Sequence, residues 1–141
     1  MNEIIISIKP NFVDKILCGE KTAELRTRRA NLLPGTKMWI YSTLPRGEIC
    51  AHAYVDYVLT DTPESIWKQF CDDIAITEEE FWQYVGTRDT VSVIKMTEVD
   101  SVDEGVTLKH IQAKIGAFCP PQFFMRLAQD NPIRSLLYQA S

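Results

Sequence analysis

Apolar and polar residues alternate along this chain in blocks that predict strands near the N-terminus and in the middle. Residues Glu3–Lys9 hold four isoleucines within five positions, and β-branched side chains are typical of a sheet. Glu48–Leu59 alternates apolar and polar residues with a period of two, which predicts an unusually long strand with one buried face. Lys37–Ser42 and Thr90–Val99 predict two further strands.

Helical spacing predicts short helices between and after these strands. The first carries apolar residues four apart on one stripe and ends at Gly19, where a helix-terminating glycine belongs. Two acidic amphipathic helices each begin with a threonine N-cap followed by glutamates. The predicted helices cover residues 11–18, 63–73, 77–86, 122–128 and 132–138, and residues 106–115 stay open between helix and loop.

The stretch Lys21–Arg29 combines a strand pattern with a high density of charge. Successive side chains of a strand point to opposite faces, so its apolar residues share one face. The other face then carries Thr22, Glu24, Arg26 and Arg28. Glu24 and Arg26 lie about 6–7 Å apart along such a strand, so they can pair directly or line a pocket together.

The candidate nucleotide-binding groups are the side chains of Lys21, Glu24 and Arg26. An arginine presents a planar fork of donors to a phosphate or a base edge, and a glutamate accepts from an exocyclic amine. Lys21 can contact phosphate, or act as a base when it is desolvated. The competing interpretation is a surface ion pair on an edge strand, where charges discourage aggregation. Spacing alone slightly favours this second interpretation.

Additional cations and hydroxyls extend the candidate site. Arg28, Arg29 and Arg46 are each more often simply solvated, but together they suit a nucleic-acid backbone. Tyr41 and Ser42 end a predicted strand, where hydroxyls can line a pocket and a tyrosine can stack on a base. For Tyr41 the favoured interpretation is a position in a β-barrel or at its rim.

Charge is unevenly distributed over the 141 residues, whose net charge is −4. The first 60 residues carry eight Lys or Arg and six Asp or Glu. Residues 61–108 are strongly acidic, with three Lys or Arg and twelve Asp or Glu, and residues 109–141 are basic, with four Lys or Arg and one acid. This leaves room for one local anion-binding face. The four cysteines are scattered among apolar neighbours, which predicts buried thiols rather than disulfides or zinc ligands.

Several classes of protein are not indicated by the sequence. No apolar run approaches the roughly 20 residues of a membrane span, and the first residues lack a signal-peptide pattern. We therefore expect a cytoplasmic protein without a membrane partner. A phosphate-cradling glycine loop, a histidine pair at ligand spacing and a nucleophile–base pair are missing, so we expect neither a metal nor a cofactor.

The chain resembles the ASCH domain family of the PUA-like superfamily, whose key motif is G-x-K-x-x-E-x-R after the first helix. The motif residues here are Gly19, Lys21, Glu24 and Arg26. Flanking sequences at 7–10, 39–45 and 120–124 resemble a bacterial and archaeal branch often described as predicted transcriptional regulators. The resemblance implies a small β-barrel with a cleft lined by the motif, and RNA or a nucleotide-like molecule as ligand.

The same family contains small hydrolases that remove an acyl group from a modified cytidine. These resemble the chain at Gly19, Lys21 and Arg26 but have a threonine in place of Glu24. A carboxylate at this position removes the expected hydroxyl nucleophile, and Thr22 is a poor substitute. The resemblance thus favours binding over amide hydrolysis.

Pattern and resemblance together predict an α+β fold. We expect a PUA-like β-barrel of five to six mostly antiparallel strands flanked by short helices, because consecutive strands can pair antiparallel. One domain would cover residues 1–141, with a helical insertion at about 62–87 and a helical tail at about 107–141.

Three functions stay open at this point. The first is an RNA- or nucleotide-binding module, with a regulatory role and phosphate contacts from the outlying arginines. The second is a hydrolase acting on a modified nucleoside or RNA, with Lys21 as base or charge stabiliser and Glu24 as proton carrier. The third is contact with a protein partner through the acidic helices at 62–86.

Overall fold

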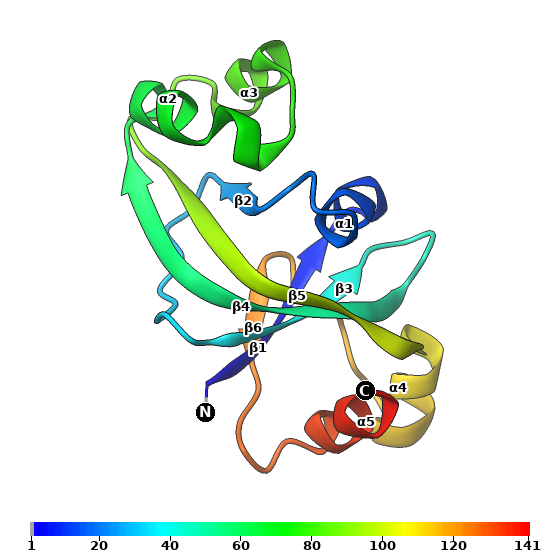
Figure 1. Cartoon of the computed structure of the whole chain (residues 1–141). Helices are drawn as coiled ribbons and strands as arrows, with labels where there is room; N and C mark the ends of the chain where they lie inside the picture. Colours follow the sequence, from blue (N-terminus) through cyan, green and yellow to red (C-terminus); the bar gives the residue numbers. More distant parts are fainter. Residues whose placement is uncertain (1) are drawn as a thin grey trace.

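The computed structural model describes residues 2–141, which fold into one mixed sheet with short helices at both ends (Figure 1). The elements in chain order are β1 (Glu3–Ile8), α1 (Pro10–Leu17), β2 (Ala23–Arg26), β3 (Lys37–Ser42), β4 (Glu48–Asp61), α2 (Pro63–Ile74), α3 (Glu78–Val85), β5 (Val91–Thr107), α4 (Leu108–Ile115), β6 (Phe124–Arg126) and α5 (Pro132–Ala140).

Six described strands run in the order β2-β5-β4-β3-β1-β6. β1 and β3 are parallel, and the other four pairings are antiparallel. The long strands β4 and β5 curve together, with α2 and α3 at one end of this ribbon and α4 and α5 at the other (Figure 1). The fold is therefore the predicted α+β arrangement of mostly antiparallel strands flanked by short helices. No helix in residues 2–141 is long and apolar enough to cross a membrane.

All six residues of β1 are buried, which explains its isoleucine-rich sequence. Ile4, Ile6 and Ile8 pack inside the barrel against α1, while Ile5 joins Trp39 on the opposite face beneath α4 and α5. A strand covered on both faces needs a nearly continuous apolar run rather than strict alternation. A third apolar cluster joins β2 and β5 to α2 and α3.

The helix predicted at residues 122–128 is wrong. β6 occupies this place and pairs antiparallel with β1, so that Ile4 lies opposite Arg126. The open edge of β1 offers backbone hydrogen bonds, including Ser7 N–H to the Phe123 carbonyl at 3.0 Å. Pairing with that edge outweighs the local helical pattern, because buried backbone groups must find partners.

Two other strands end at different residues than the sequence predicts. The charged strand is shorter than predicted, because β2 ends at Arg26 and the chain bends away before Arg28. β5 continues past Val99 as far as Thr107, whose side chain then caps α4 in the stretch left open by the sequence. The thiols of Cys18 and Cys119 are exposed rather than buried, and all four cysteines are free.

A buried carboxylate attaches the C-terminal helix to the sheet. Glu3 Oε1 accepts a 2.8 Å hydrogen bond from Trp39 Nε1, and Oε2 accepts one of 2.8 Å from the Tyr138 hydroxyl. Arg134 Nη1 lies 3.2 Å from the same Oε2. Burial, followed by the bond to Glu3, raises the pKa of Tyr138 to about 12, so this hydroxyl stays a donor.

Replacing Glu3 with glutamine tests this attachment. Glu3→Gln replaces a carboxylate oxygen by an NH2 group, which cannot accept a hydrogen bond from Trp39, Tyr138 or Arg134. We therefore expect a loss of about 1–3 kcal/mol in the free energy of unfolding. The measurement is urea denaturation followed by circular dichroism. Glu104→Gln, at an exposed position of β5, is the matched control and should change stability by less than about 0.5 kcal/mol. Equal effects of the two substitutions would refute the structural role of Glu3.

Candidate functional site

β2 carries the motif residues Glu24 and Arg26 at one edge of the sheet, and Lys21 lies just before it. β2 pairs with β5, so that Glu24 lies opposite Ile94 and Arg26 opposite Ser92. Ala23 and Leu25 point into the cluster beneath α2 and α3. The predicted alternation is therefore confirmed as far as Arg26, and it directs Glu24 and Arg26 to the opposite face.

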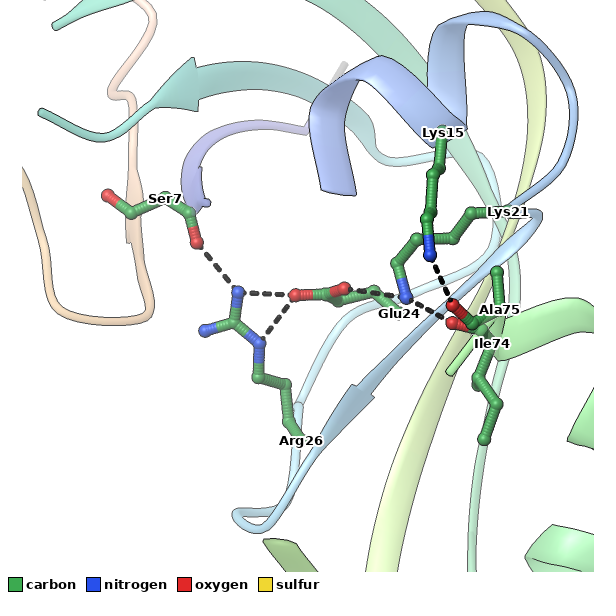
Figure 2. Close-up of polar contacts among 7 residues, drawn as sticks. All are labelled: Ser7, Lys15, Lys21, Glu24, Arg26, Ile74 and Ala75. Atoms are coloured by element: carbon green, nitrogen blue, oxygen red, sulfur yellow. Dashed lines mark hydrogen bonds and ion pairs between the residues drawn. The ribbon is translucent and has the colours of Figure 1, made fainter. Parts of the chain in front are cut away.

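Glu24 lies between two cations (Figure 2). Its Oε2 accepts hydrogen bonds from Arg26 Nε at 2.9 Å and Nη2 at 2.6 Å, and its Oε1 is 3.3 Å from Lys21 Nζ. Glu24 is only 5% exposed and Lys21 only 2%. A surface ion pair is therefore the wrong interpretation. These charges are largely removed from water and depend on one another.

Lys21 connects this network to the end of α2. Its Nζ donates to the Ile74 carbonyl at 2.9 Å and lies 4.9 Å from the centre of the Phe12 ring. Burial lowers the pKa of Lys21, and the neighbouring Glu24 opposes that shift. Lys15 makes a similar bond of 2.9 Å to the next carbonyl, Ala75. Both lysines satisfy carbonyls that a helix C-terminus leaves without partners.

Arg26 connects β2 to β1 across the opening of the barrel. Nη2 donates to the Ser7 carbonyl at 2.7 Å as well as to Glu24, and the guanidinium carbon lies 4.7 Å from the centre of the Phe123 ring. Within residues 2–141, Nη1 has no hydrogen-bond partner, and Figure 2 shows it without a dashed line. Two N–H groups of a rigidly held guanidinium thus remain for a ligand.

These side chains border a cavity of about 700 Å³, within the range that small-molecule and cofactor sites occupy. It lies between α1, β2, the end of β1, α3 and the segment before β6. The lining residues that matter here are Lys21, Glu24, Arg26, Phe12, Tyr84 and Gln122. The cavity therefore combines aromatic walls with a fixed group of charges.

The structure brings three of the predicted site residues together and separates the others. Arg46 is paired with Asp14 on α1, with Nη1 3.0 Å from Oδ1. Tyr41 and Ser42 are 2% and 0% exposed, because both faces of β3 are covered. None of these three lines the cavity, so the structure does not place Tyr41 where a base could stack on it.

Arg28 and Arg29 also lie outside the cavity. Both are exposed on the segment that follows β2. Arg29 lines a separate groove of about 480 Å³. Arg28 and Arg29 are separated from Arg26 because β2 ends at Arg26. The strand alternation that would have put Arg28 on the same face as Arg26 therefore stops before it.

Sequence reasoning missed the aromatic walls and the contribution of α3. Glu80, Gln83 and Tyr84 of α3 line the cavity. The only local signal is that these residues fall on the side of α3 away from its buried Phe81 and Val85. Nothing in the local pattern shows that these residues border the same cavity as Glu24 and Arg26 of β2. Among the described residues, no group of three His, Cys, Asp or Glu could hold a metal ion.

Comparison with known proteins identifies the fold and the family. The fold is that of ASCH-domain proteins: the crystal structure of ASCH from Zymomonas mobilis superposes with a TM-score of 0.90 at 22% identity, covering 99% of this chain and 96% of that one. Residues 1–119 match the family described as "Domain of unknown function (DUF365)", and the chain belongs to that family.

Two further proteins are similar to this chain at low identity, one in sequence and one in fold. A Zymomonas mobilis protein named "ASCH domain-containing ribonuclease" is 22% identical over 129 residues, covering 92% of this chain and 86% of that protein. Human THYN1, solved in complex with DNA containing 5-methylcytosine, superposes with a TM-score of 0.60 at 8% identity, covering 100% of this chain and 98% of that one.

Removing the central carboxylate tests the network. Glu24→Ala leaves Lys21 and Arg26 without their shared partner, and we expect a loss of about 3–5 kcal/mol in the free energy of unfolding. Urea denaturation measures it. The matched control is Glu20→Ala at an exposed neighbouring position, which should be nearly neutral. A cost for Glu24→Ala no larger than that of the control would show that the network adds nothing to stability.

Proposed function

We propose that this protein binds single-stranded RNA and holds one nucleotide in the cavity beside Lys21, Glu24 and Arg26. The observation that carries the proposal is the unused Nη1 edge of Arg26, fixed by Glu24 and Ser7 at the cavity wall. A guanidinium held in place loses little conformational freedom on binding, and it suits a phosphate or the acceptor edge of a base.

Glu24 supplies the complementary acceptor. Its Oε2 is used by Arg26, whereas Oε1 has only the 3.3 Å contact with Lys21. Oε1 therefore retains capacity for an exocyclic amine, which cytosine and adenine both present. A donor and an acceptor side by side match a base edge better than they match a simple anion.

Aromatic side chains provide the stacking surface. Phe12 lines the inner wall, and Tyr84 lies at the rim, where it is 44% exposed. Base–aromatic stacking contributes about 1–3 kcal/mol per base in single-strand binding. The similarity to a protein named as a ribonuclease and to one solved with DNA supports a nucleic acid as the ligand class.

The same proposal extends to the cellular role. We place the protein in the cytoplasm as a regulator that acts through RNA, in line with the flanking sequences that resemble a regulatory branch. The exposed acids of α2 and α3, among them Glu64, Asp72 and Glu79, are the surface we propose for a basic protein partner.

Binding of a short labelled RNA tests the main proposal. Arg26→Gln should weaken binding about tenfold or more, since one arginine contact contributes roughly 1–3 kcal/mol. Affinity should also fall as salt rises. Fluorescence anisotropy measures both effects, with Lys109→Gln, at an exposed position on α4, as the control of equal charge change. Unchanged affinity in Arg26→Gln, or binding insensitive to salt, would contradict the proposal.

Hydrolysis of RNA is the second candidate, and the ribonuclease relative favours it. Lys21 and Arg26 would stabilise negative charge that develops on the phosphate, and Glu24 would orient a water or carry a proton. Glu24 holds both cations, so its loss would affect each of these roles.

Gel analysis of an end-labelled RNA tests this candidate. Glu24→Gln should slow cleavage by about 100-fold or more, the usual scale of a general acid–base contribution. Lys21→Met should do the same, and Lys109→Gln should cleave at the wild-type rate. If the purified protein leaves RNA intact, or if all variants cleave equally, the hydrolase candidate is wrong.

A further inference from the structure

The segment after β2, residues 27–33, packs against the inner apolar cluster of the barrel and makes a tight turn at Asn31, where the Leu32 N–H donates to the Ala30 carbonyl at 2.9 Å. Ala30 and Leu32 point inward and are 7% and 6% exposed, while Arg29, Asn31 and Leu33 point to solvent. Arg126 of β6 donates through Nη2 to the Asn31 carbonyl. The segment is therefore anchored at alternate residues and presents a fixed row of outward side chains.

An open groove of about 480 Å³ runs between this segment and β4. Its lining residues are Arg29, Ala30, Asn31, Leu32, Leu33, Val58 and Thr60. No carboxylate belongs to this lining. The groove thus differs in charge from the acidic surface of the neighbouring helices.

The groove and the cavity take lining residues from the same face of the sheet. Thr60, which lines the groove, pairs on β4 with Ser92 on β5, which in turn pairs with Arg26 of the cavity lining on β2. Directly paired residues of an antiparallel sheet point to the same face. The hydroxyls of Thr60 and Ser92 are 2.7 Å apart, which agrees with this alignment. Arg26 and Thr60 therefore lie on one side of the sheet, with β5 between their strands.

Two exposed arginines lie on the segment at 27–33, and a third, Arg126, is bonded to it. Arg28, Arg29 and Arg126 are exposed, and the three residues from Arg26 to Arg29 span at most about 11 Å of chain. In the described part of the chain, the backbone N–H groups of Arg28, Arg29 and Asn31 donate to no other protein group. Guanidinium and free amide donors together suit a phosphate backbone.

We propose that the groove is a second subsite for the same strand, so that the ligand is a polynucleotide rather than a free nucleotide. One nucleotide occupies the cavity, the strand passes Arg28, and a neighbouring nucleotide lies in the groove with its phosphate at Arg29. This inference rests on the proposed RNA-binding function. It adds a route for the strand, from the cavity to the groove. It also assigns a phosphate contact to Arg29, which does not line the cavity.

A series of labelled cytidine oligonucleotides, whose bases carry the exocyclic amine that Glu24 would accept from, tests the second subsite, from a mononucleotide up to about eight nucleotides, within the range that single-strand binding domains cover. Anisotropy gives the affinity at each length and salt concentration, and a gel confirms that each oligonucleotide stays intact. The variants are Arg29→Ala and, as the matched control outside both hollows, Lys109→Ala.

The expected result is an increase in affinity once the oligonucleotide is long enough to reach the groove. Arg29→Ala should remove about tenfold of the affinity for the long oligonucleotides, the size of one lost charge-assisted hydrogen bond. It should also lower the salt slope by roughly 0.7. The mononucleotide should bind Arg29→Ala and wild type equally, and Lys109→Ala should match wild type throughout.

The negative results have different meanings. Affinity that is independent of length, or that Arg29→Ala leaves unchanged, overturns the second subsite while nucleotide binding in the cavity stands. Absence of binding at every length overturns the RNA-binding function and the subsite with it. Equal losses for long and short oligonucleotides in Arg29→Ala also reject the subsite, because they indicate a general disturbance of the fold.

Discussion

The local architecture depends on two ion pairs that the buried Glu24 carboxylate makes, one with Lys21 and one with Arg26. A lone buried charge is costly, so each of the three groups is tolerated only because the others are present. Through Lys21 the carboxylate holds the end of α2, and through Arg26 it holds the edge of β1. One side chain thus fixes a helix, two strands and the wall of a cavity.

This arrangement also explains how an edge strand of four residues can support a site. β2 is too short to be rigid through its own ladder, but Thr22 N–H donates to the Asp73 carbonyl at 2.8 Å and Lys95 bonds the Thr22 hydroxyl at 2.8 Å. Backbone and side-chain bonds on both flanks replace the missing strand partner. The donors of Arg26 are consequently set in position before a ligand arrives, and binding need not order them.

Sequence reasoning recovered the fold class, the long β4 strand and the grouping of Lys21, Glu24 and Arg26. These depend on local periodicity and on a spacing of two along one strand, which a sequence records directly. It did not recover the β6 strand or the contribution of Tyr84 to the cavity. Both depend on which surface a distant segment meets, the β1 edge in one case and the space above β2 in the other. The separation of Arg28 from Arg26 was missed because nothing local marks the point where β2 stops.

The helices α2 and α3 connect β4 to β5 at one end of the ribbon that these two strands form (Figure 1). Residues of α3 nevertheless line the cavity. The charged floor of the cavity belongs to the barrel, whereas Gln83 and Tyr84 belong to this connection. The floor depends on the end of α2, whose Ile74 carbonyl Lys21 bonds, but the side chains of Gln83 and Tyr84 on α3 can change without removing that bond. A relative could keep the same anchoring chemistry and alter its choice of ligand by exchanging these rim residues of one connection between two strands.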